Sequence, residues 1–339
     1  MNLQLKTELP QPTAWPKLNL DPDKSTLVYI HIPKTAGSTF KSKIDAVTQK
    51  INLKSIDYEK IYSKKSSNQK FKSKSKQKTK NPHFEWYPDS DTHSWNSLGC
   101  RKGAQFGATH CGFSEIRSCI DSHEATLNYS KLDTIKYFSV IRDPVERVIS
   151  EYFWWKNEAT PGAWTESLKQ ASKNFTAWIL HPDNSAHNRQ FNSFVDFSDI
   201  GHPESHDDDC LNLKGDWFVE YWYGKRSWKH QGLSDLELTK NVFDNVQRNF
   251  GFIGVLEEME ESLGILEFLL GGEIEKTVKN IPQSEKQGKK RKTHSSNKGK
   301  VTVIQKRLIW ERNQLDLALY KFVQTQLNLT ASKLWPERD

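Results

Sequence analysis

The sequence predicts an α/β fold, a mostly parallel, doubly wound sheet with helices on both faces. Short apolar runs, typical of buried strands, alternate with longer segments of helical pattern. The apolar runs cover residues 27–32, 104–109, 137–141 and 250–255, and the helical patterns cover about residues 36–50, 144–157, 234–248, 257–270 and 301–326. Ligands of such sheets bind beyond the carboxyl ends of the strands. The residues that follow each apolar run are therefore candidates for a site.

The first apolar run ends at Pro33, and Lys34, Gly37, Ser38 and Thr39 follow before a helical pattern begins. A strand, a tight turn and a helix N-terminus together bind phosphate, because the N–H groups at the turn point at the anion. Glycine lets the backbone approach closely, and the hydroxyls and the lysine add donors and charge. The lysine precedes the glycine here, so the spacing is not that of the nucleotide P-loop G-x-x-x-x-G-K-[ST]. An ordinary turn with a surface lysine is the structural alternative.

The second apolar run, 104–109, is followed by His110. A histidine has an unperturbed pKa of about 6.5 and suits proton transfer near neutral pH. A core histidine that bonds to the backbone is the alternative for His110.

The third apolar run, 137–141, is followed by Arg142. Asp143 can cap the next helix, and Pro144 suits the first helical turn. Ser150 lies about two turns into this helix. An arginine fork and a serine hydroxyl together can bind a phosphate, although Arg142 could also be an ordinary surface charge.

The later elements are predicted by caps and apolar runs. Ser234 and Glu237 form a capping box ahead of the helical pattern 234–248, and the apolar run 250–255 follows it. Lys34, His110 and Arg142 thus all fall at the carboxyl ends of predicted strands. Three unrelated motifs at one edge of a sheet predict a shared site.

Two stretches resemble the cofactor motifs of carbohydrate sulfotransferases that use 3′-phosphoadenosine 5′-phosphosulfate (PAPS). Residues 31–40 (His-Ile-Pro-Lys-Thr-Ala-Gly-Ser-Thr-Phe) are similar to the P-loop-like turn that binds the 5′-phosphosulfate, and residues 142–152 are similar to the 3′-phosphate motif Arg-Asp-Pro-x-x-Arg-x-x-Ser-x-Tyr. Residues 107–113, residues 188–190 (Asn-Arg-Gln) and the last predicted helix, which ends in residues 313–322, resemble heparan sulfate 6-O-sulfotransferases. The resemblance covers about residues 27–327.

The resemblance implies transfer of a sulfuryl group from PAPS to a carbohydrate hydroxyl, with the 6-hydroxyl as one candidate position. Lys34 and His110 would be catalytic, on the leaving group and on the acceptor proton respectively. The implied PAPS-binding residues are Lys34, Thr35, Ala36, Gly37, Ser38, Thr39, Arg142, Ser150, Ser295 and Ser296. No metal is required, because the ester to be broken is already activated.

The acceptor side is implied less directly. Arg101, Lys102, Trp154 and Trp164 are the candidate acceptor-binding residues. Trp154 stands where the family carries a histidine, and Trp164 matches a family tryptophan only across a short insertion. These departures leave the sugar and its hydroxyl position open.

We expect three segments in the 339-residue chain: a polar N-terminal segment 1–26, a sulfotransferase domain 27–327 and a C-terminal tail 328–339. The Lys-rich ranges 64–80 and 286–300 are predicted to be disordered insertions. The net charge of +7 suits an anionic acceptor or nucleotide. The resemblance implies a carbohydrate or glycan acceptor, including a polyanionic one. No nucleic-acid module accompanies the basic ranges, so no nucleic-acid partner is expected.

The sequence shows no signal peptide or membrane-spanning segment, which predicts a soluble, cytoplasmic protein. The Golgi lumen is the expected compartment if the chain lacks a native anchor, since animal relatives work there. The four cysteines show no C-x-x-C spacing, so no zinc site is expected. The oligomeric state stays open.

Two other functions are consistent with parts of the sequence. A P-loop-like nucleotide kinase would need a Gly-Lys-[ST] motif and an acidic magnesium ligand; Asp143 could be that ligand, but the lysine position does not fit. A non-catalytic glycan- or nucleotide-binding protein on the same fold would use Trp154, Trp155 and Trp164 equally well. The presence of His110 favours the enzyme.

Overall fold

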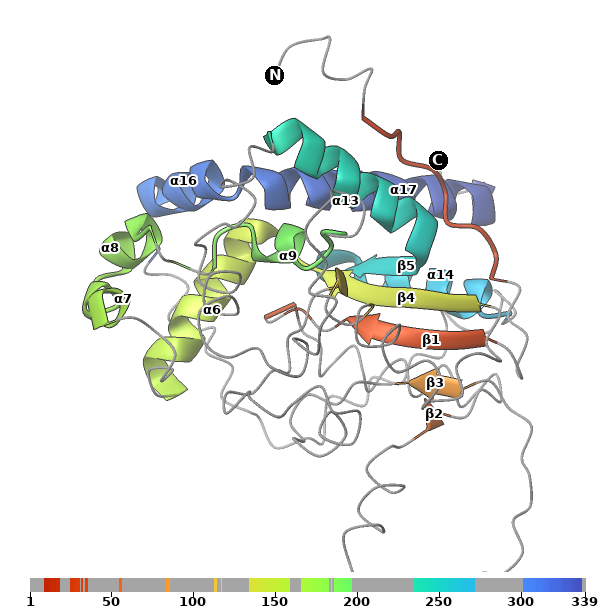
Figure 1. The fold of residues 1–339 in the computed structure, drawn as a ribbon, viewed down its shortest axis with the longest axis horizontal. Helices are drawn as coiled ribbons and strands as arrows, with labels where there is room; N and C mark the ends of the chain where they lie inside the picture. The colour runs from red at the N-terminus through yellow and green to blue at the C-terminus, as the bar shows by residue number, and fades with distance from the viewer. Residues whose placement is uncertain are drawn as a thin grey trace, which may run out of the picture.

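A computed structural model shows how most of the predicted elements are arranged (Figure 1). The structure describes residues 9–18, 25–30, 32, 34–35, 55–56, 83–85, 113–114, 117, 134–158, 166–182, 184, 186–196, 234–271 and 301–336. The predicted strand 104–109, the predicted helix 36–50 and the Lys-rich ranges 64–80 and 286–300 lie outside these residues.

The described strands form one parallel sheet in the order β2-β3-β1-β4-β5. Their bounds are β1 Ser25–Ile30, β2 Ser55–Ile56, β3 His83–Glu85, β4 Thr134–Ile141 and β5 Phe250–Val255. The predicted strands that fall on described residues are thus present, whereas the short strands β2 and β3 were not predicted. From β1 the chain adds strands first on one side and then on the other. The order of the strands therefore reverses beside β1, which is where open α/β sheets bind ligands.

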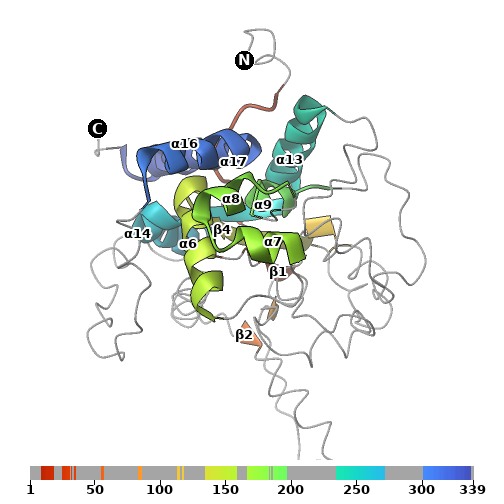
Figure 2. The same cartoon turned by 90° about the vertical axis from the view of Figure 1, so that its left-hand side faces the viewer.

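Helices surround this sheet, as expected for the α/β class. They are α6 Pro144–Glu158, α7 Glu166–Ala171, α8 Phe175–Leu180, α9 Arg189–Asn192, α13 Asp235–Asn249, α14 Met259–Leu269, α16 Val303–Arg312 and α17 Gln314–Leu334, with the 3₁₀ turn η4 Leu256–Glu258. Figure 2 shows α13 and α14 on opposite sides of β4. All arrowheads in Figure 1 point toward α6, so α6 to α9 lie beyond the carboxyl ends of the strands.

Local caps start two of these helices as predicted. The Asp143 carboxylate accepts a hydrogen bond from the Glu146 N–H at 2.9 Å, and Pro144 is the first residue of α6. Ser234 and Glu237 form the reciprocal capping box at the start of α13.

The prediction of one helix over residues 301–326 is wrong, because the helix breaks at Asn313. This residue is fully buried, and its side chain bonds to the Ile309 carbonyl and to the Asn188 N–H, at 2.7 and 2.9 Å. The tertiary contact to Asn188 separates α16 from α17. Helix α17 also runs on to Leu334, so residues 328–334, expected in a C-terminal tail, are helical.

Residues 9–18, which we expected to lie ahead of the domain, pack against it. Trp15 is buried, its ring contacts Phe252 of β5, and its backbone N–H donates to the Thr330 hydroxyl at 2.9 Å. Residues close to both ends of the chain therefore belong to one core.

None of the described helices has both the length and the hydropathy that a transmembrane span requires.

Candidate active site

The chain turns sharply after β1 at Lys34. This residue has φ of +67°, an uncommon left-handed conformation for a residue with a side chain. The buried Thr35 holds the turn, because its hydroxyl donates to the Ile32 carbonyl at 2.8 Å. With its hydroxyl engaged, Thr35 can offer only its backbone N–H to an anion.

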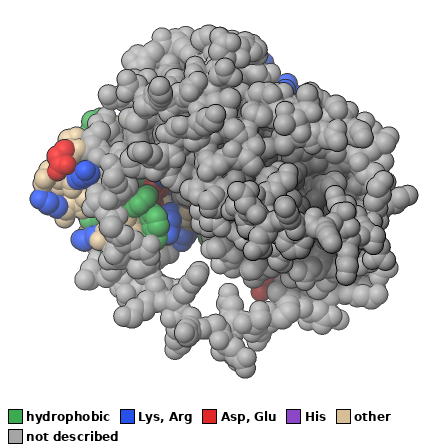
Figure 3. Space-filling view, turned by 60° about the horizontal axis from the view of Figure 1, so that its bottom comes forward, with side chains coloured by type: hydrophobic (Ala, Val, Ile, Leu, Met, Phe, Trp, Pro, Cys, Tyr) green, Lys and Arg blue, Asp and Glu red, His purple; other side chains and the backbone are tan. Residues whose placement is uncertain are grey.

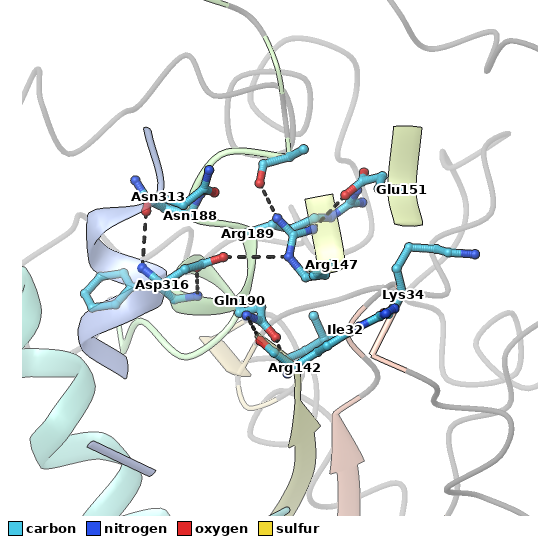
Figure 4. Close-up of polar contacts among 12 residues, drawn as sticks. Ile32, Lys34, Arg142, Arg147, Glu151, Asn188, Arg189, Gln190, Asn313 and Asp316 are labelled. Carbon is cyan, nitrogen blue, oxygen red and sulfur yellow. Dashed lines mark hydrogen bonds and ion pairs between the residues drawn. The ribbon is translucent and has the colours of Figure 1, made fainter. Parts of the chain in front are cut away.

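The turn after β1 is bonded directly to the residue that follows β4. Arg142 Nη1 donates to the Lys34 carbonyl at 3.2 Å, although the two residues are 108 positions apart in the sequence. Figure 4 shows Arg142 between Lys34 and Gln190 at the ends of two strands. Because β1 and β4 are parallel neighbours, their carboxyl ends meet at one edge of the sheet. The predicted meeting of the two motifs is therefore present.

The guanidinium of Arg142 is mostly shielded from water. Its side chain is 14% exposed, and carboxylate oxygens of Glu146 and Glu257 lie 3.9 Å away. Burial lowers the pKa of Arg142, and the two glutamates oppose that effect. Within the described residues its buried Nε–H has no hydrogen-bond acceptor. An oxyanion bound at this position would satisfy that N–H.

Glu257 is a further site residue that we did not predict. It accepts hydrogen bonds from the Asp143 N–H at 3.1 Å and from the Tyr320 hydroxyl at 3.3 Å. Burial is the main cause that raises the pKa of Glu257, and burial together with the charge of Glu257 raises that of Tyr320. The sequence pattern could have predicted Glu257, because it lies just after β5, as Lys34 and Arg142 lie just after β1 and β4.

The Asn-Arg-Gln triplet singled out in the sequence supports the site. Gln190 is buried, and its side-chain amide accepts from the Arg142 N–H and donates to the Arg142 carbonyl, each at 2.8 Å. This pair of bonds fixes the backbone at the end of β4. Asn188, with φ of +50°, accepts from the N–H groups of Leu315 and Asp316 and so caps α17.

A buried ionic cluster lies behind the site. Arg147 is fully buried and pairs with Glu151 at 2.6 Å and with Asp316 at 3.7 Å, while Arg189 also pairs with Glu151. Burial would raise the pKa of Glu151, but Arg189 and Arg147 outweigh it and lower that pKa. Burial raises the pKa of Asp316 to about 6, against the opposing charge of Arg147. These charged side chains link α6, α9 and α17 through ion pairs.

Two predicted site residues lie further along α6. Trp154, expected to contact the acceptor, has its ring centroid 4.8 Å from Lys34 Nζ. Ser150 is partly exposed, and no contact among the described residues joins its hydroxyl to Lys34 or Arg142. The structure thus groups Lys34, Thr35, Arg142 and Trp154.

The other predicted site residues lie outside the described part of the chain and remain predictions. They are Ala36, Gly37, Ser38, Thr39, Arg101, Lys102, His110, Trp164, Ser295 and Ser296.

A match to a family model covers the part of the chain that carries Arg142 and Glu257. A family model described as Sulfotransferase family matches residues 114–323, more than half of the chain. The chain is 26% identical over 226 residues to uronyl 2-sulfotransferase of Mus musculus, covering 62% of this chain and 48% of the relative. The Homo sapiens uronyl 2-sulfotransferase is 26% identical over 225 residues, with the same shares covered. The chain thus spans about half the length of the curated relatives it matches.

Proposed function

The chain belongs to the Sulfotransferase family, and on that premise we propose that it transfers a sulfuryl group from PAPS to a carbohydrate hydroxyl. One observation carries this proposal: the 3.2 Å hydrogen bond from Arg142 to the Lys34 carbonyl. It joins one residue from each of the two stretches whose resemblance implies binding of the 5′ and 3′ phosphates of one nucleotide. A single donor molecule can therefore contact both.

The described residues fit such a donor. The buried Nε–H of Arg142 has no acceptor among the described residues and is suited to a phosphate oxygen, and Lys34 places a cation at the turn after β1. When bound, PAPS supplies a sulfuryl group on an activated phosphosulfate. Lys34 would stabilise the charge that develops on the leaving phosphate, and Arg142 with Ser150 would hold the 3′-phosphate. The other residues proposed for the donor site are Thr35, Ala36, Gly37, Ser38, Thr39, Ser295 and Ser296.

His110 is proposed to accept the proton of the acceptor hydroxyl. Arg101, Lys102 and Trp164 are proposed to contact the acceptor, and the net charge of +7 suits an anionic glycan. In this proposal these residues bind the acceptor, whereas the residues that follow β1 and β4 bind the donor.

For the position of transfer, two candidates differ in their support. The matched relatives are named uronyl 2-sulfotransferases, which favours the 2-hydroxyl of a uronyl unit. The resemblance of residues 107–113 and 188–190 to heparan sulfate 6-O-sulfotransferases favours the 6-hydroxyl, a position that neither matched relative supports. We take the uronyl 2-hydroxyl as the leading candidate. Mass spectrometry of products from defined uronyl-containing oligosaccharides distinguishes the two positions.

The donor assignment is tested by calorimetric titration with adenosine 3′,5′-bisphosphate and 5′-AMP. The bisphosphate should bind more tightly by about 1.5–3 kcal/mol, the range for hydrogen bonds to charged groups. Arg142→Ala should abolish this preference, while Arg142→Lys, which keeps the charge but not the fork, should retain part of it. Equal affinity of the native protein for both nucleotides would contradict the assignment.

Turnover separates an enzyme from a non-catalytic binding protein. With PAPS and a uronyl oligosaccharide, His110→Ala should lower turnover by about 10²–10⁴-fold and leave bisphosphate affinity unchanged. Lys34→Ala should lower both. A native protein that binds donor and glycan but transfers nothing would be a binding protein on this fold.

A further inference from the structure

Lys34 is held at both ends by residues from one segment of the chain. Its carbonyl accepts a hydrogen bond from Arg142, and its ammonium lies 4.8 Å from the ring centroid of Trp154. Arg142 lies two residues before the start of α6, and Trp154 lies about three turns into that helix. The backbone and the side chain of Lys34 are therefore both positioned against α6.

The contact with Trp154 has the geometry of a cation–π interaction, since an ammonium within about 6 Å of a ring centroid is attracted by the ring. Tryptophan is the strongest aromatic partner for a cation, and both side chains here are partly buried, which strengthens the attraction. A lysine side chain is otherwise flexible. The ring therefore stabilises the charged form of Lys34 and restricts where its ammonium can lie.

Trp154 is itself supported from the core. The ring of Trp155 lies 4.1 Å away at 63°, an edge contact. Trp155 packs against the apolar cluster of α6, α8 and α16, and its Nε1 donates to the buried Glu151 at 3.5 Å. A chain of contacts thus runs from the ionic cluster through Trp155 and Trp154 to Lys34.

Figures 3 and 4 show the surface on the side of α6 and the direction of the Lys34 side chain. On the left of Figure 3, which is the side of α6 and α7 in Figure 1, hydrophobic and basic side chains adjoin one another. Figure 4 shows the Lys34 side chain directed away from Gln190 and Asp316.

We propose that Trp154 is a positioning residue for Lys34, whose ammonium it holds at the donor site, rather than a contact for the acceptor. The role assigned to that ammonium rests on the proposed function, but the contact itself does not. At this position the indole face is engaged by the lysine, which leaves the other candidate residues to bind the sugar.

Competitive acylation of lysines with acetic anhydride, read by mass spectrometry, tests the contact without any ligand. Loss of the ring removes the group that covers the Lys34 ammonium at 4.8 Å and should leave this amine more accessible to the reagent. Trp154→Leu should therefore raise Lys34 labelling by about threefold or more, and Trp154→Phe should raise it less. Lys17, which lies over Phe268 at 5.5 Å, serves as the internal control and should label equally in all variants. Equal labelling of Lys34 in native and Trp154→Leu protein would overturn the proposal.

Further measurements separate positioning from a structural role and from the proposed function. Thermal unfolding of Trp154→Leu should match that of Trp310→Leu, an exposed tryptophan of α16. If Trp154→Leu does not fold, unchanged Lys34 labelling in Trp154→Phe overturns the proposal.

Turnover assays test the role of the contact in catalysis. The kcat should fall in Trp154→Leu and largely recover in Trp154→Phe. An unchanged kcat in Trp154→Leu would overturn the role assigned to Trp154. The acylation is also repeated with adenosine 3′,5′-bisphosphate, which should reduce the labelling of Lys34. If the bisphosphate does not reduce it while Trp154→Leu still raises it, the positioning role stands and the donor assignment fails.

Discussion

Asp316 shows how a single buried carboxylate couples this fold to pH. It lies 3.7 Å from Arg147, accepts a hydrogen bond from the Phe191 N–H at 2.7 Å and is fully buried. Burial outweighs these contacts and raises its pKa to about 6. A carboxyl with a raised pKa in the folded state stabilises the fold fully below its ordinary pKa. That contribution is lost as the pH rises through the folded value.

We therefore predict that native protein loses stability relative to Asp316→Asn between about pH 4 and pH 6. Urea unfolding of both proteins at several pH values gives this difference. Glu151, with its lowered pKa, acts in the opposite direction, but it is present in both proteins and cancels. If the native protein instead gains stability relative to Asp316→Asn as the pH rises from about 4 to 6, the charge of Arg147 outweighs the effect of burial on Asp316.

Glu257 is one of the residues that neutralise and orient the side chain of Arg142. Two carboxylates, Glu146 and Glu257, partly neutralise the guanidinium, while Gln190 fixes its backbone. The arginine is thus oriented by contacts that leave its Nε–H without an acceptor among the described residues. Such prior orientation reduces the entropy lost when a ligand binds.

Helix α17 depends on a cap supplied from a distant element. Asn188 precedes α9, yet its side chain accepts from the N–H groups of Leu315 and Asp316 at 3.1 and 3.2 Å. The first N–H groups of a helix have no partner within the helix, so a side chain from elsewhere can satisfy them. This contact joins α17 to the segment that supports Arg142.

Replacement of Asn188 should therefore be costly at this junction. Asn188→Ala removes the cap and puts alanine, which tolerates the left-handed region less well than asparagine, at φ of +50°, for a loss of about 2–4 kcal/mol. Asn188→Gly removes the cap but adopts the positive φ freely, so it should lose less. Asn174→Ala, which removes an exposed cap of α8, is the matched control and should cost about 1 kcal/mol. Denaturant unfolding measures all three; equal losses for Asn188→Ala and Asn174→Ala would count against the tertiary cap.

On the scale of the whole molecule, the N-terminal segment closes the core against the last helix. Besides Trp15, Gln326 of α17 donates to the Thr13 carbonyl at 3.2 Å, and the Leu18 N–H donates to the Leu269 carbonyl at 3.1 Å. Residues 9–18 therefore bridge α17 and the end of α14.

Trp15→Ala should destabilise the protein by about 3–5 kcal/mol, the usual cost of removing a large buried aromatic side chain. The exposed Trp310 is the matched control, and Trp310→Ala should cost less than about 1 kcal/mol. Denaturant unfolding followed by circular dichroism compares them. Equal midpoints for the two variants would show that the N-terminal segment does not stabilise the core.

Short local patterns in the sequence determined many of the strands and helix starts of this protein. The apolar runs that became β1, β4 and β5, the Asp143 cap and the Ser234 capping box all depend on local hydrogen bonds and burial. The placement of Lys34 and Arg142 at strand ends followed from the same local pattern. Parallel topology then predicted that they share one edge of the sheet.

Only the tertiary structure decided which side chains complete the site. The helix break at Asn313, the bonds from Gln190 to Arg142 and the contact of Trp154 with Lys34 join residues far apart in the sequence. Each partner depends on the strand order and on how helices pack beyond the strands, which no local pattern contains. Likewise, the sequence places Arg147 in the second motif but does not show that packing buries it completely. Burial and pairing arise together from the assembled fold, because a charge can be buried only where its partners are already in place.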